Sequence, residues 1–74
     1  MYPTRYVVCI DVRSMLEGRL VRTAQAVIVA TTPQRAAGHR SVWEMRQRLC
    51  EGLKCGDWYF ETTVVAEQKE ARHA

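Results

Sequence analysis

Only one stretch of this chain has the periodicity of a helix, and it lies between segments that alternate as β-strands do. The helical stretch covers residues 33–52, and the extended stretches cover 6–12, about 19–31 and 58–66. With 74 residues, the chain has room for one domain and one hydrophobic core. Because a single helix covers only one face of a sheet, the sequence predicts a sheet whose other face lies open.

The first and third strands have clear patterns. In each strand, alternate residues are apolar or β-branched and lie on one face. They are Tyr6, Val8, Ile10 and Val12 in the first strand, and Trp58, Phe60, Thr62 and Val64 in the third. Between the first two strands, residues 14–18 predict a turn in which Gly18 adopts a positive φ.

The second strand has a less regular pattern. Its apolar residues change parity near Gln25, which predicts a β-bulge at that position. Residues 67–74 are polar and without apolar pattern, so we expect a frayed tail there.

The helix has a recognisable start. Thr32 is a suitable N-cap, and Pro33 suits the first helical position because its missing N–H costs nothing there. The stripe that faces the sheet contains Val42, Met45, Leu49 and Leu53. Gly38 predicts a kink or a short first turn. Trp43 lies beside the stripe, either completing the core, which we favour, or projecting as an interface anchor.

The order of these elements defines the fold class. A β-β-α-β chain with a right-handed crossover gives an α+β domain: a three-stranded antiparallel sheet in the order 2-1-3, with one helix packed on one face. We expect residues 1–66 to form this single compact domain. The open face should then expose apolar side chains, namely Val7, Cys9, Tyr59 and Val65.

Residues capable of catalysis or metal binding do not form a recognisable motif. Cys50, Cys55 and His39 lack the paired short spacing of a zinc site. We expect these cysteines to be reduced thiols, with a disulfide between Cys50 and Cys55 as the weaker alternative. No nucleophile has an oriented base beside it, and the glycines are scattered. The sequence therefore predicts no enzyme, no metal and no cofactor.

Targeting signals are also not apparent. Residues 1–13 contain no basic start followed by an apolar run, and the longest uncharged apolar stretch, 24–30, is too short to span a bilayer. We expect a cytoplasmic protein that does not contact a membrane.

Positive charge is concentrated in the first 55 residues, which hold nine basic and four acidic side chains, within a chain of net charge +3. Arginine predominates, and its guanidinium suits bidentate pairing with phosphates or carboxylates, although codon bias gives the same excess. The candidate binding residues are Arg35, Arg40, Arg46 and Arg48 on the helix, and Arg5, Arg13 and Tyr59 on the sheet.

In size and element order, residues 6–66 resemble the small inhibitors carried by phages and mobile elements, including some anti-CRISPR proteins. Many of those inhibitors are acidic and imitate DNA, whereas this chain is basic. The resemblance implies stoichiometric binding to a host protein or ribonucleoprotein, with no catalysis.

We therefore predict a small binding module that acts as an inhibitor or adaptor through protein contact. One alternative is direct binding of RNA or single-stranded DNA, through the helical arginines or by stacking of bases on Tyr59. A second alternative is a structural homodimer that forms through the open sheet face.

Overall fold

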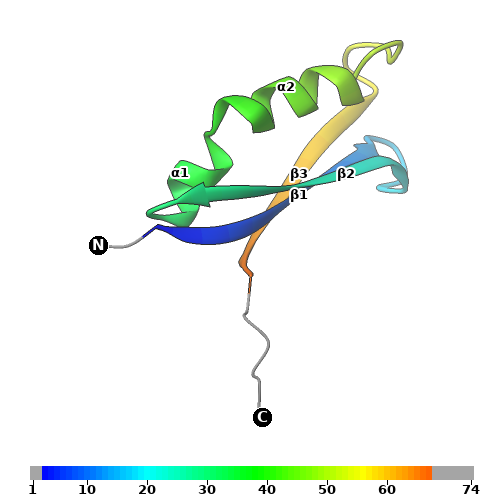
Figure 1. Cartoon of the computed structure of the whole chain (residues 1–74). Helices are drawn as coiled ribbons and strands as arrows, with labels where there is room; N and C mark the ends of the chain where they lie inside the picture. Colours follow the sequence, from blue (N-terminus) through cyan, green and yellow to red (C-terminus); the bar gives the residue numbers. More distant parts are fainter. Residues whose placement is uncertain (1–2, 68–74) are drawn as a thin grey trace.

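The computed structural model describes residues 3–67. Along the chain it forms β1 (Thr4–Ser14), β2 (Leu20–Ala30), α1 (Pro33–Ala37), α2 (Arg40–Leu49) and β3 (Trp58–Ala66). The three strands form one antiparallel sheet in the order β2-β1-β3, and both helices lie on the same side of it (Figure 1). The predicted α+β fold and its strand order are confirmed.

The core lies between the central strand and the helices. Alternate side chains of β1 point toward the helices because successive residues of a strand face opposite sides. They are buried together with one residue of β2 and one of each helix: Tyr6, Val8, Ile10, Val12, Ile28, Ala36 and Val42. Every fully buried large side chain among residues 3–67 is therefore aliphatic and lies on one side of the sheet.

The helical segment is divided in two, so the expected single helix over 33–52 is wrong. α1 begins as predicted, with the Thr32 hydroxyl accepting a hydrogen bond from the Arg35 N–H at 3.1 Å, but it ends at Ala37. Gly38 follows as a C-cap, where its low helix propensity favours a break. His39 then caps α2, because its Nδ1 accepts the Ser41 N–H at 3.1 Å. α2 itself ends at Leu49, so Leu53 lies outside it.

The bulge lies elsewhere than predicted. The β1–β2 register runs unbroken past Gln25 and shifts between Val12 and Arg13, where Val21 is the extra residue. Apolar residues occupy both parities of β2 because its open side is itself apolar, with Val27 and Val29 exposed there. The change of parity in the sequence therefore reflects an apolar outer face and not a change of strand direction.

At the two ends of the sheet, the structure confirms one prediction from the sequence and differs from another. Gly18 has a φ of 69° in the predicted turn between β1 and β2. Glu67, assigned to the tail from the sequence, donates its backbone N–H to the Arg5 carbonyl at 2.8 Å. The remainder of the expected tail, 68–74, lies outside the described residues.

Arg22 joins β2 to the end of α2. Its Nη1 donates to the Leu49 carbonyl at 2.7 Å and to the Glu51 carbonyl at 2.8 Å. The last carbonyls of a helix have no partner within the helix, and a cation there also interacts favourably with the helix dipole. Arg22 therefore helps to fix α2 on the sheet, a role that the sequence analysis did not assign to it.

Replacing Arg22 by Gln should lower the free energy of unfolding by about 1–2 kcal/mol, because two hydrogen bonds from a charged donor, to the Leu49 and Glu51 carbonyls, are lost. Urea denaturation followed by circular dichroism measures the change. Arg19→Gln is the matched control, since Arg19 forms only an exposed ion pair with Glu17 at 3.5 Å, for which a change within about 0.5 kcal/mol is expected. Equal effects of the two substitutions would contradict the capping role.

Candidate interaction surfaces

The face of the sheet opposite the helices has no second layer within residues 3–67, as Figure 1 shows from the side. The strand register places its side chains in rows across β2, β1 and β3. From one end to the other, the rows are Val29–Arg5–Glu67, Val27–Val7–Val65, Gln25–Cys9–Thr63, Thr23–Asp11–Glu61 and Leu20–Arg13–Tyr59. We call this the open face.

One end of the open face is apolar. Val27, Val29 and Val65 are 46%, 55% and 57% exposed, and Val7 is half-buried between them. We call these four residues the valine patch. β-branched side chains from three adjacent strands thus form one continuous apolar surface, and large exposed apolar patches are typical of interaction sites.

The arginines of the open face already have carboxylate partners. Arg5 Nε lies 2.6 Å from Glu67 Oε1, and Arg13 Nε lies 2.9 Å from Glu61 Oε1. Arg13 also lies 3.6 Å from Asp11. The hydrogen bond that Arg13 donates to Glu61 raises the pKa of Arg13 above its ordinary value, against the opposing effect of desolvation. Two arginines here face three carboxylates, so the open face is not a basic surface.

Tyr59 and Cys9 complete the polar part of this face. Tyr59 lies opposite Arg13 and is 38% exposed. Cys9 occupies the central row, where its Sγ lies 3.6 Å from Asp11 Oδ1 and 3.8 Å from Thr23 Oγ1. Cys9, Cys50 and Cys55 are all free thiols, so the structure contains no disulfide between Cys50 and Cys55.

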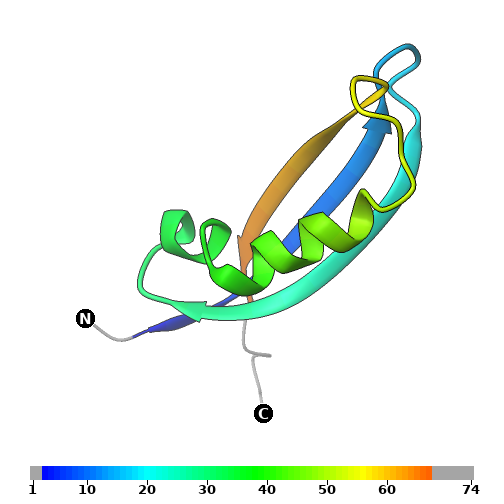
Figure 2. The ribbon, with the colours of Figure 1, turned by 90° about the horizontal axis from the view of Figure 1, so that it is seen from above.

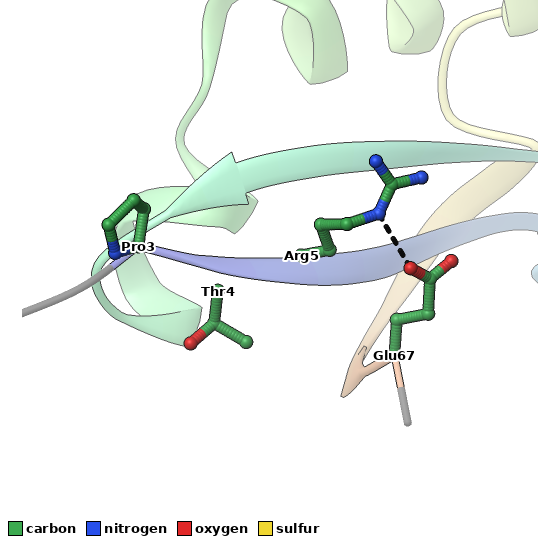
Figure 3. A pocket seen from close by; sticks show the side chains of 4 residues that line it. All are labelled: Pro3, Thr4, Arg5 and Glu67. Carbon is green, nitrogen blue, oxygen red and sulfur yellow. Dashed lines mark hydrogen bonds and ion pairs between the residues drawn. The ribbon is translucent and has the colours of Figure 1, made fainter. Parts of the chain in front are cut away.

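A small hollow of about 270 Å³ lies at the Arg5 end of the sheet, lined by Pro3, Thr4, Arg5 and Glu67. Figure 3 shows the Arg5–Glu67 ion pair beside it. The charged groups that line the hollow are paired with each other, which leaves no charged group dedicated to a ligand.

The helical arginines divide into two groups. Arg35, Arg40 and Arg48 are exposed, and none of them forms an ion pair within residues 3–67. Arg46 instead points toward the sheet, where its Nη2 donates to Thr62 Oγ1 at 2.9 Å. The four predicted binding arginines of the helical segment therefore do not form one surface.

Arg46 fills the space between α2 and β3. Its guanidinium carbon lies 5.2 Å from the ring centroid of Trp43 and 5.7 Å from that of Phe60, within range of cation–π attraction. The sequence analysis grouped Arg46 with the other three helical arginines, although Arg46 lies four residues after the stripe position Val42 and therefore on the same side of the helix. Arg48 lies four residues after Glu44, on the opposite face.

A groove of about 300 Å³ runs beside this arginine, lined by Trp43, Arg46, Gln47, Cys50 and Phe60. It exists because α2 lies over β2 and β1, so that β3 runs beside the helix and not beneath it (Figure 2). Trp43 is 56% exposed here. The preference for Trp43 as a core residue is therefore wrong, and the interface-anchor alternative fits its exposure.

Two buried nitrogens near β3 lack hydrogen-bond partners within the described residues: Arg46 Nε and Trp58 Nε1. Trp58 packs its ring edge-on against Phe60, with centroids 4.9 Å apart. Buried polar groups without partners are uncommon in folded proteins. The β3 side of the helix layer thus contains both buried side-chain nitrogens that lack hydrogen-bond partners within the described residues.

Within residues 3–67, no group of three or more His, Cys, Asp or Glu side chains lies close enough to hold a metal ion. Neither helix has the length and hydropathy that crossing a bilayer requires. Comparison of the chain with protein-family models, curated proteins and solved structures found no match.

Arg46→Ala should lower the free energy of unfolding by about 1–2 kcal/mol, because the hydrogen bond to Thr62 and the stacking on two rings are lost. Arg48→Ala, two residues away and exposed, is the matched control and should change stability by less than about 0.5 kcal/mol. Thermal and urea denaturation measure both. If the two variants lose the same stability, Arg46 does not have the packing role described here.

Proposed function

We propose that this protein is a small non-catalytic binding module, and that it inhibits or bridges a host protein or ribonucleoprotein by docking the open face of its sheet. The partner surface is apolar where it meets the valine patch and polar where it meets the ion pairs of Arg5 and Arg13. The proposal agrees with the resemblance in size and element order to small phage and mobile-element inhibitors.

The valine patch is the observation that carries this proposal. A domain this small buries its apolar side chains on one side of the sheet and leaves others in water on the opposite side. Covering exposed apolar area is favourable by roughly 25 cal/mol per Å². A protein partner with a complementary apolar surface gains that free energy without any change in the fold.

Charge favours a protein over a nucleic acid as the partner of the open face. Nucleic-acid binding depends mainly on unpaired basic groups that neutralise phosphates. On this face, Arg5 and Arg13 are held by Glu67, Glu61 and Asp11. A phosphate backbone would have to displace these carboxylates.

Direct nucleic-acid binding remains the second candidate because Arg35, Arg40 and Arg48 are exposed without ion pairs among the described residues. An arginine-bearing helix follows a phosphate backbone through such groups. This candidate uses the opposite side of the molecule, so substitutions can separate the two.

The test is capture of a partner by the tagged protein from a lysate of cells that carry the gene, treated with nuclease. We expect Val27→Thr/Val29→Thr to lose the captured protein, because the isosteric change makes the patch polar without disturbing strand propensity. Val27→Ile/Val29→Ile is the matched control and should retain it. The triple variant Arg35→Ala/Arg40→Ala/Arg48→Ala should also retain it.

The opposite pattern would overturn the proposal. Loss of capture in the arginine variant, together with retention in Val27→Thr/Val29→Thr, would assign binding to the helix side. Recovery of nucleic acid alone, released steeply by added salt, would favour the RNA or single-stranded DNA alternative. Mutual association of two copies through the valine patch, with no other partner, would favour the structural homodimer.

A further inference from the structure

The outer edge of β3 is unusually suited to pairing with another strand. β3 has nine residues, contains no proline, glycine or lysine, and pairs with β1 without a register shift. Natural edge strands are commonly protected by such residues, by bulges or by covering segments. By contrast, β2 has the bulge at Val21. Each edge strand is contacted on its helix side, β2 by both helices and β3 by α1.

The backbone groups available at this edge follow from two hydrogen bonds. The Glu67 N–H donates to the Arg5 carbonyl, and the Asp57 carbonyl accepts the Met15 N–H. Because bonding direction alternates along an antiparallel strand, odd-numbered residues of β3 bond to β1. The N–H and C=O groups of the even-numbered residues from Trp58 to Ala66 therefore point away from the sheet.

A second copy of β3 fits this edge about a two-fold axis at Thr62. In an antiparallel pair centred there, Thr62 faces Thr62, and Phe60 and Tyr59 of one copy face Val64 and Val65 of the other. Aromatic residues opposite β-branched residues are favourable cross-strand pairs. In this pairing, every hydrogen-bonded pair consists of even-numbered residues, which are the residues whose backbone groups point outward.

Charge selects this register over its neighbours. Glu61 is the one charged residue within β3, and in the register centred on Thr62 it faces Thr63. Centring the axis on Glu61 would place two carboxylates directly opposite each other, which is destabilising. Centring it on Thr63 would put Glu61 opposite Val65 and Tyr59 opposite Glu67.

We propose that the protein forms a homodimer in which two β3 strands pair antiparallel about Thr62, giving a continuous six-stranded sheet. The symmetry is isologous, since the same edge of each copy meets the other. The groove that contains Trp43 lies along this edge and faces the partner copy. Both pairs of helices lie on one side of the dimer, so the two open faces form one larger surface on the other side.

This dimer is independent of the proposed function, because the valine patch remains uncovered in it. It also differs from a homodimer through the open face, which would cover the patch. The two arrangements therefore give opposite results for substitutions at Val27 and for substitutions at the β3 edge.

Cysteine cross-linking tests the register in a background where Cys9, Cys50 and Cys55 are replaced by Ser. Glu61→Cys and Thr63→Cys are prepared separately and oxidised either alone or mixed. The proposed register places residue 61 opposite residue 63 of the other copy, with Cα atoms about 4.5 Å apart, within disulfide range. Identical residues of the two copies are about 8 Å apart, which is too far.

We expect disulfide-linked dimers from the mixture and not from either variant alone. Cross-linking of Glu61→Cys to itself, or of Thr63→Cys to itself, would overturn the proposal because it reports a neighbouring register. The control is a mixture of Thr63→Cys with Thr23→Cys, which lies on the opposite edge strand. This mixture measures the rate of disulfide formation by random collision. A mixture that cross-links no faster than this control would also overturn the proposal.

Solution mass gives an independent test. Light scattering of the unmodified protein should report twice the 8.5 kDa chain mass. Thr62→Glu should give a monomer, because two carboxylates then meet on the axis. Thr62→Gln, of the same shape but neutral, should remain a dimer. A monomeric unmodified protein, or a Thr62→Glu variant that stays dimeric, would contradict the proposal.

Discussion

Burial of alternate β1 side chains against the two helices is the interaction on which the rest of the structure depends. Val8, Ile10 and Val12 are fully buried, and β1 is hydrogen-bonded to a neighbour on both edges. The helices together are too short to cover three strands, and they cover only one side. Within residues 3–67, the open face, the groove beside β3 and the unpaired edge of β3 all follow from this limited helical cover.

The charged side chains also differ between the open face and the helix side of the sheet. On the open face, arginines and carboxylates neutralise each other beside an apolar patch, whereas the exposed arginines without partners among the described residues lie on the helices. The overall charge of +3 therefore does not describe either surface. The first surface supports the proposed protein partner, and the second supports the nucleic-acid alternative.

The sequence predicted the fold because period-two burial in β1 and the Thr32–Pro33 helix start are local signals. It predicted a kink or a short first turn at Gly38 but not two separate helices, since the His39 imidazole is an unusual cap and Gly38 alone only weakens a helix. The inward direction of Arg46 and the exposure of Trp43 depend on how far α2 reaches over β3. The position of α2 over the sheet is set by tertiary packing, which the local sequence pattern does not predict.

The most direct test of the central claim uses Cys9, which lies in the middle row of the open face. In a Cys50→Ser/Cys55→Ser variant, Cys9 is the one remaining thiol. Its alkylation rate is measured by mass spectrometry in the free protein and in the complex with the captured partner. Strong slowing in the complex is the predicted result, because the proposed binding mode covers this face. An unchanged rate in a fully formed complex would contradict it and place the partner on the helix side.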